Sequence, residues 1–153
     1  MRNKKNKGVI EIHNFIPHSH VKWVFNNDFL IFNDSENTFE RNVFETFKGW
    51  IAKIDGEIAG SCLYKVQDPG TKIKRPTWYF AYLGILPKFQ SCGVGTKLLN
   101  TLLEHADKSR ANLECDTSNT NSAALHLYKK HNFVVAETGS YMILTRRPQR
   151  LKI

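Results

Sequence analysis

The sequence feature that most constrains the fold is a short glycine-containing turn between an apolar strand and a leucine-rich helix. Residues 77–86 are rich in aromatic and branched side chains, which favour a strand. Residues 90–95 read Gln-Ser-Cys-Gly-Val-Gly. The helix expected after them carries apolar residues at helical spacing on one face, namely Leu98, Leu99, Leu102, Leu103 and Ala106. A strand that turns directly into a helix in this way is typical of α/β domains.

The rest of the chain alternates between strand and helix patterns. Asp55-Gly56 supplies the positive φ angles that a two-residue hairpin turn needs, and apolar runs flank it. One or two amphipathic helices are expected within residues 19–48, and another ends near Lys130. Strands are expected over residues 9–13, 49–54, 57–66, 77–86, 111–115, 133–137 and 141–145. The order predicts one α/β domain with a mixed, mostly antiparallel central sheet flanked by helices.

Composition is that of a globular chain large enough to bury a core. The 153 residues are 41% hydrophobic. Cys62, Cys92 and Cys115 are far apart and form no Cys-x-x-Cys pair, so we expect neither a disulfide framework nor a metal site. No apolar stretch reaches the roughly 20 residues that span a bilayer, and no signal-peptide pattern follows the basic start. The expected location is the cytoplasm, without membrane contact.

Positive charge is concentrated at the two ends of the chain. The net charge is +8, and residues 1–8 and 146–153 contain eight Lys and Arg and no acidic residue. We therefore expect a basic tail over 1–8, a neutral domain over 9–145 and a second basic tail over 146–153. Such tails can contact RNA or ribosomes without sequence specificity, although solvated ends are the commoner case. Nucleic-acid binding is thus a minor alternative.

The turn at residues 90–95 has the chemistry of a phosphate site. Glycine lets the backbone approach a ligand closely, and free amides at a helix N-terminus favour an anion. A dinucleotide fingerprint would need glycine or alanine where Leu98 stands, and a P-loop would need Gly-Lys-Ser/Thr, which is absent. A plain tight turn is the alternative explanation.

A second pattern pairs Asn121 with Tyr128. Seven residues separate them, so on a helix they lie within roughly 20° of each other around the axis. An amide at the helix start and a phenol two turns later would then face the same side. The alternative is that Asn121 is a helix cap and Tyr128 a core aromatic residue.

Together the two patterns resemble the GNAT superfamily of N-acetyltransferases. The family motif Gln/Arg-x-x-Gly-x-Gly/Ala matches Gln90, Gly93 and Gly95, and its lead-in strand matches Leu83, Ile85 and Pro87. The later motif matches Asn121, Ala124, Tyr128 and Phe133, so the resemblance covers residues 77–137. Three positions depart from it. Asn132 replaces a glycine, Gln90 stands where arginine is common, and residues 78–83 lack the carboxylate that often serves as general base.

The resemblance implies acetyl-CoA as acetyl donor and direct transfer to a primary amine in a ternary complex. Backbone groups of Leu83, Gly84 and Ile85 would hold the pantetheine arm. Tyr128 would be the general acid that protonates the leaving thiolate, because a phenol with a pKa of about 10 stays protonated at pH 7. The further donor-binding residues implied by the family are Gln90, Ser91, Cys92, Gly93, Val94, Gly95, Thr96, Asn121 and Ala124.

The general base is not given by the family motif. Glu114 and Asp116 at the end of a short strand could remove the amine's proton through water, and Tyr82 could anchor that water. The alternative is that all three are structural or surface groups. The acceptor stays open among protein N-termini, lysine, polyamines, aminoglycosides and metabolites, and the chain could be a monomer or a homodimer. The alternative function is a non-catalytic acyl-CoA-binding sensor or docking module.

Overall fold

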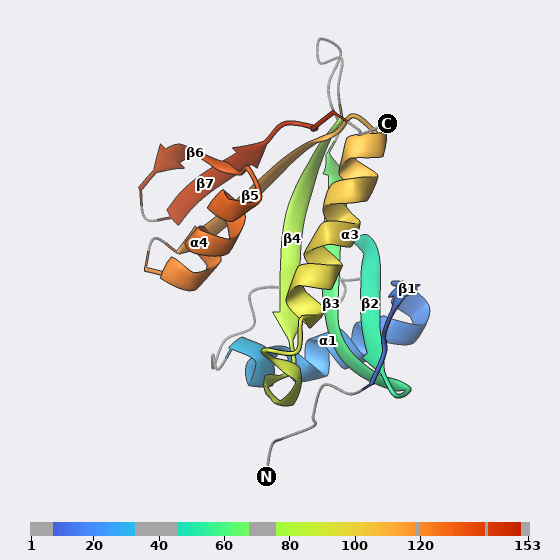
Figure 1. Ribbon diagram of the computed structural model, residues 1–153. Coiled ribbons are helices and arrows are strands. Elements are labelled where there is room, and N and C mark those ends of the chain that lie inside the picture. Colours follow the sequence, from blue (N-terminus) through green and yellow to red (C-terminus); the bar gives the residue numbers. More distant parts are fainter. Residues whose placement is uncertain (1–7, 33–45, 68–75, 119, 140, 151–153) are drawn as a thin grey trace. The chain divides into compact units, whose positions relative to one another are not determined.

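The computed structural model describes residues 8–32, 46–67, 76–118, 120–139 and 141–150. Three α-helices are described, α1 (Pro17–Phe32), α3 (Val94–Lys108) and α4 (Ser122–Lys130), with a 3-10 turn at Pro87–Phe89. The strands are β1 (Ile10–Asn14), β2 (Lys48–Ile54), β3 (Glu57–Gln67), β4 (Thr77–Ile85), β5 (Asn112–Ser118), β6 (Val134–Thr138) and β7 (Tyr141–Arg146) (Figure 1). Part of the region expected to hold a second helix (33–45), most of the N-terminal tail (1–7) and the last residues of the C-terminal tail (151–153) lie outside the described residues.

The strands form one mixed sheet in the hydrogen-bonded order β1-β2-β3-β4-β5-β7-β6. The pairs β1–β2, β2–β3, β5–β7 and β6–β7 are antiparallel, whereas β4–β5 is parallel. This arrangement confirms the predicted α/β class with its mixed sheet. Among the described residues, no helix is long and apolar enough to cross a membrane.

The chain divides into two compact units, and the first consists of Met1–Lys65 and Ala81–Leu102. Its β2–β3 hairpin turns at Asp55 and Gly56, whose φ angles of 52° and 81° confirm the predicted turn. The Nζ of Lys97 in α3 donates a hydrogen bond to the carbonyl oxygen of Ile10 in β1 (3.1 Å). The core of this unit contains Phe15, Val24, Phe47, Ile51, Leu63 and Tyr82.

Within this unit β3 approaches the end of β4 closely. A side chain at Gly60 would place its Cβ 2.7 Å from the carbonyl oxygen of Gly84, which only glycine avoids. The amide of Leu86 donates to the carbonyl oxygen of Ala59 (2.9 Å). The backbone just before the glycine turn is therefore held firmly against β3.

The second unit consists of Val66–Phe80 and Leu103–Ile153. In it β5, β7 and β6 lie next to α4 (Figure 1). β5 is longer than predicted: residues 116–118, expected as a polar loop, pair with Ile143, Met142 and Tyr141 of β7. The prediction was too short because backbone pairing holds these residues in the strand, and an outward-facing strand position needs no apolar side chain.

A buried ion pair between Asp107 and Arg146 joins the end of α3 to the end of β7 in this unit. Both Nη atoms of Arg146 contact the carboxylate of Asp107 near the end of α3, at 2.8 and 3.2 Å. The Nε of Arg146 donates to the carbonyl oxygen of His131 after α4 (3.1 Å), and the amide of Gln149 donates to Asp107 (2.9 Å). Arg146, the first residue of the expected C-terminal tail, is thus the last residue of β7, with a side chain only 4% exposed.

Replacing Asp107 by alanine should lower the free energy of unfolding by about 3 kcal/mol, because it leaves the buried Arg146 guanidinium without its counterion. Urea denaturation followed by circular dichroism measures this change. Glu104→Ala on the exposed side of α3 is the matched control and should change stability by less than about 0.5 kcal/mol. Equal stability of the two variants would contradict the structural role of the ion pair.

Candidate active site

The glycine turn of the first unit has the backbone geometry of an anion site. Ser91 and Gly93 adopt φ angles of 67° and 88°, and nothing lies within 4 Å of the position a Gly93 Cβ would take. The Gly93 carbonyl oxygen accepts a hydrogen bond from the amide of Lys97 (3.1 Å). This hydrogen bond lies at the start of α3, which begins at Val94. The first turn of α3 carries no acidic residue, so its amides favour an anion. The segment brings together the predicted phosphate-binding residues Gln90, Ser91, Cys92, Gly93, Val94, Gly95 and Thr96.

The end of β4 is joined to this turn by a side chain. The Nε2 of Gln90 donates a hydrogen bond to the carbonyl oxygen of Ile85 (3.1 Å). A Cβ on Gly95 would lie 3.7 Å from the Ile85 side chain, an ordinary packing distance. Leu83 and Gly84, the other predicted pantetheine-binding residues, precede Ile85 in β4. The Gln90 side chain therefore links the glycine turn to the end of β4 by a hydrogen bond.

The predicted Asn121–Tyr128 pair lies on α4 in the second unit. Asn121 is the helix N-cap: its Oδ1 accepts the amide of Ala124 (3.2 Å). The half-buried Tyr128 ring contacts Phe80 edge-on at 5.6 Å between centroids and Phe133 at 5.5 Å. The capping and aromatic packing that sequence alone left as an alternative are both present.

Polar groups gather on the outward face of β4 and β5 in the same unit. Tyr79 of β4 lies opposite Glu114 of β5, and the Tyr79 hydroxyl donates to Oδ1 of Asp116 (3.4 Å). Glu114 lies opposite Thr145 of β7. Residues two apart on a strand share a face, so Glu114 and Asp116 both present carboxylates beside the phenol. The structure brings the two predicted base candidates together with a tyrosine.

This environment keeps Tyr79 protonated. Burial of the phenol raises its pKa to about 12, and the negative charge of Asp116, the hydrogen bond to Asp116 and the charges around it act in the same direction. At pH 7 the Tyr79 hydroxyl is therefore a proton donor to Asp116, and its phenolate form is not populated.

Tyr79 is the residue that sequence reasoning missed. We predicted that Tyr82 could anchor the water through which the base acts, but Tyr82 is 5% exposed and belongs to the core of the first unit. Strand alternation was the available signal. Tyr82 has the same parity along β4 as the buried Trp78 and Phe80, whereas Tyr79 has the parity of the outward face.

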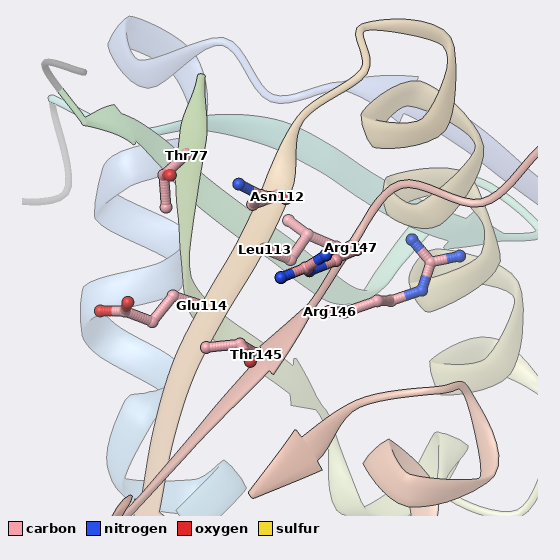
Figure 2. A pocket seen from close by; sticks show the side chains of 7 residues that line it. All are labelled: Thr77, Asn112, Leu113, Glu114, Thr145, Arg146 and Arg147. Carbon is pink, nitrogen blue, oxygen red and sulfur yellow. The ribbon is translucent and has the colours of Figure 1, made fainter. Parts of the chain in front are cut away.

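A pocket of about 210 Å³ adjoins this face (Figure 2). Its lining is polar and contains one acidic residue, Glu114, and two basic residues, Arg146 and Arg147. Figure 2 shows the Arg146 side chain on the opposite side of the strand from Glu114, where Asp107 binds it. The remaining lining residues are Thr77, Asn112, Leu113 and Thr145.

The three cysteines, Cys62, Cys92 and Cys115, form no disulfide. All three are free thiols, and burial raises the pKa of Cys115 to about 12 and that of Cys62 further. Within the described ranges no group of three or more His, Cys, Asp or Glu side chains could hold a metal ion.

Sequence comparison matches residues 19–133 to the model of the "Acetyltransferase (GNAT) family". N-alpha-acetyltransferase 50 of Danio rerio is 31% identical over 137 residues, covering 86% of this chain and 79% of that protein.

Two solved structures have the same fold. The ribosomal-protein-S18-alanine N-acetyltransferase from Escherichia coli superposes with a TM-score of 0.76 at 16% identity, covering 94% of this chain and 97% of that one. Naa50 from Arabidopsis thaliana, in complex with the bisubstrate analogue CoA-Ac-MVNAL, gives 0.71 at 14% identity and covers 90% and 97%.

Replacing Asp116 by asparagine should lower the pKa of Tyr79 from about 12 towards the ordinary value of about 10, because the charge that opposes the phenolate is removed. The pKa should stay above the ordinary value, since burial is the larger cause. NMR titration of tyrosine labelled at 13Cζ measures it, with Tyr79→Phe to assign the signal. Glu137→Gln, on an exposed strand, is the control and should leave the pKa unchanged. An unchanged pKa in Asp116→Asn would contradict the contact.

Proposed function

Because this chain belongs to the acetyltransferase (GNAT) family, we propose that it transfers an acetyl group from acetyl-CoA to a primary amine by direct attack in a ternary complex. The observation that carries this proposal is the family match over residues 19–133, within which the glycine turn opens α3. The relatives support the reaction type, since one is named as an N-alpha-acetyltransferase.

We assign donor binding to the residues of this chain that match the family's two motifs. We assign the pyrophosphate to the amides from Cys92 to Thr96, which suit an anion because the backbone around Gly93 is open and the first turn of α3 lacks acidic residues. The Gln90 side chain is engaged with Ile85, so its role would be to hold the turn. Backbone groups of Leu83, Gly84 and Ile85 are assigned to the pantetheine arm. Asn121 and Ala124 are assigned to the same donor through the backbone, because the Asn121 side chain caps α4.

Acetyl-CoA supplies an activated acetyl thioester. The acceptor nitrogen forms a bond to the acetyl carbon and the carbon–sulfur bond breaks. Tyr128 donates its hydroxyl proton to the departing sulfur. Its ring is fixed by Phe80 and Phe133, which leaves the hydroxyl as the polar end of an otherwise apolar contact.

The proton of the acceptor amine needs a route to a carboxylate. We assign it to Asp116, with the Tyr79 hydroxyl as relay: Tyr79 takes a proton from the amine side as it passes its own to Asp116. Relay rather than phenolate chemistry follows from the high pKa of Tyr79. The 3.4 Å separation is long, as catalytic hydrogen bonds often are without substrate. Glu114 is the second candidate base, and Tyr82 would act only as a buried support.

We propose the α-amine of a polypeptide as the acceptor. Three similar proteins favour it by name: an N-alpha-acetyltransferase, a ribosomal-protein alanine N-acetyltransferase and a structure with an analogue that joins CoA to the peptide MVNAL. The experiment is thiol release from acetyl-CoA with a free-amine MVNAL peptide, an N-blocked lysine peptide, spermidine and an aminoglycoside. Turnover with the first alone supports the proposal. Turnover with another amine changes the acceptor class, and tight acetyl-CoA binding without any turnover favours a sensor.

Tyr128→Phe should lower kcat about a hundredfold with little change in the KM for acetyl-CoA, because it removes the general acid and keeps the ring. Steady-state kinetics with the best acceptor measures this. Tyr141→Phe, which alters an exposed tyrosine of β7, is the matched control and should keep the original kcat. A kcat that Tyr128→Phe leaves unchanged would remove Tyr128 from the mechanism.

Tyr79→Phe and Asp116→Asn should each lower kcat/KM about a hundredfold at pH 7, because each interrupts the proton route. The loss should shrink as the pH rises from 7 to 9. An α-amine with a pKa of about 8 becomes neutral over that range and then needs no base. The pH profile of kcat/KM tests this, with Glu137→Gln as control. A loss that is equally large at both ends of the range would point to a structural effect.

A further inference from the structure

The pocket of Figure 2 combines Glu114, the second candidate base, with polar groups that have no assigned role in acetyl transfer, Arg147 among them. Strand register places its side chains next to one another: Thr77 lies opposite Asn112, and Glu114 lies opposite Thr145. Arg147 follows Arg146, which pairs with Leu113, so it lies beside Asn112. All of these residues belong to the second unit.

The polar side chains of this pocket lack side-chain partners among the residues that the structure describes. Thr77, Asn112, Glu114, Thr145 and Arg147 form no side-chain hydrogen bond or ion pair with another described residue. Four of them are half-buried, and only Arg147 is fully exposed. Half-buried polar groups without protein partners are held by water alone, and a ligand that offers matching groups can displace that water.

The charges on the pocket lining indicate the class of ligand. Glu114 offers one carboxylate and Arg147 one guanidinium, while the second arginine of the lining, Arg146, is bound by Asp107. A guanidinium binds a carboxylate through two parallel hydrogen bonds, and a carboxylate binds an ammonium. A polyphosphate would meet repulsion from Glu114, and a polyamine would meet repulsion from Arg147. We propose that this pocket binds a small zwitterion, a free α-amino acid, with its ammonium at Glu114 and its carboxylate at Arg147.

The size of the pocket agrees with this class. At about 30 Å³ per water, 210 Å³ corresponds to roughly seven water molecules. Sites for drug-sized molecules occupy about 300–1,000 Å³, so this one suits a smaller ligand. The lining also carries the hydroxyls of Thr77 and Thr145 and the amide of Asn112, which can form hydrogen bonds with a polar side chain of the ligand.

The test is direct binding to the full chain. The twenty standard L-α-amino acids are screened by thermal denaturation, and the best is titrated by calorimetry. At least one should bind, with a Kd at least tenfold lower than that of ethanolamine, which carries only the ammonium, and of propionate, which carries only the carboxylate. Glu114→Gln and Arg147→Gln should each weaken binding at least tenfold. Arg150→Gln, an exposed arginine outside the lining, is the control and should leave the Kd unchanged.

Three outcomes would overturn the proposal. They are an absence of binding by all twenty amino acids, binding that survives both pocket substitutions, and ethanolamine binding as tight as that of the best amino acid. Arg147→Gln should keep the original kcat/KM for acetyl transfer, because Arg147 has no assigned role in that reaction. The ligand site and the proposed activity can therefore fail independently.

Discussion

The second unit depends on the ion pair between Asp107 and Arg146. One carboxylate near the end of α3 holds the last residue of β7 and the amide of Gln149, while the same guanidinium satisfies the carbonyl oxygen of His131 after α4. Three separate segments thus share one charged contact. Because the pair is almost fully buried, losing either partner exposes the other to an apolar surrounding rather than to water.

Because side chains alternate along β4 and β5, the two strands have an apolar inner face and a polar outward face. One parity places Trp78, Phe80 and Leu113 in the core, and the other places Tyr79, Glu114 and Asp116 on the outward face. Phe80 of the inner face also contacts Tyr128, so one strand orients both the proposed acid and the proposed proton relay. The alternation of side chains along the strands, rather than any single residue, therefore determines which groups lie together in the candidate site.

Much of this was predictable from local patterns. Asp55-Gly56 requires a hairpin and the turn at residues 90–95 requires close backbone approach, so these elements follow from glycine and turn chemistry. The Tyr79–Asp116 contact was not predicted, because it depends on the register between two strands that lie far apart in sequence. Arg146 was assigned to a tail for a similar reason. A sum of charges does not reveal which arginine meets a buried carboxylate.

The hydrogen bond between Lys97 and Ile10 lies at an edge of the sheet. β1 is one of the two edge strands of the sheet, and an edge strand offers unpaired backbone groups on which another chain can add a strand. Lys97 occupies one carbonyl oxygen at the start of β1 and brings a positive charge against it. Natural sheets use lysine in this way against edge-to-edge aggregation. The helix that opens at the glycine turn therefore also covers one backbone acceptor of an edge strand.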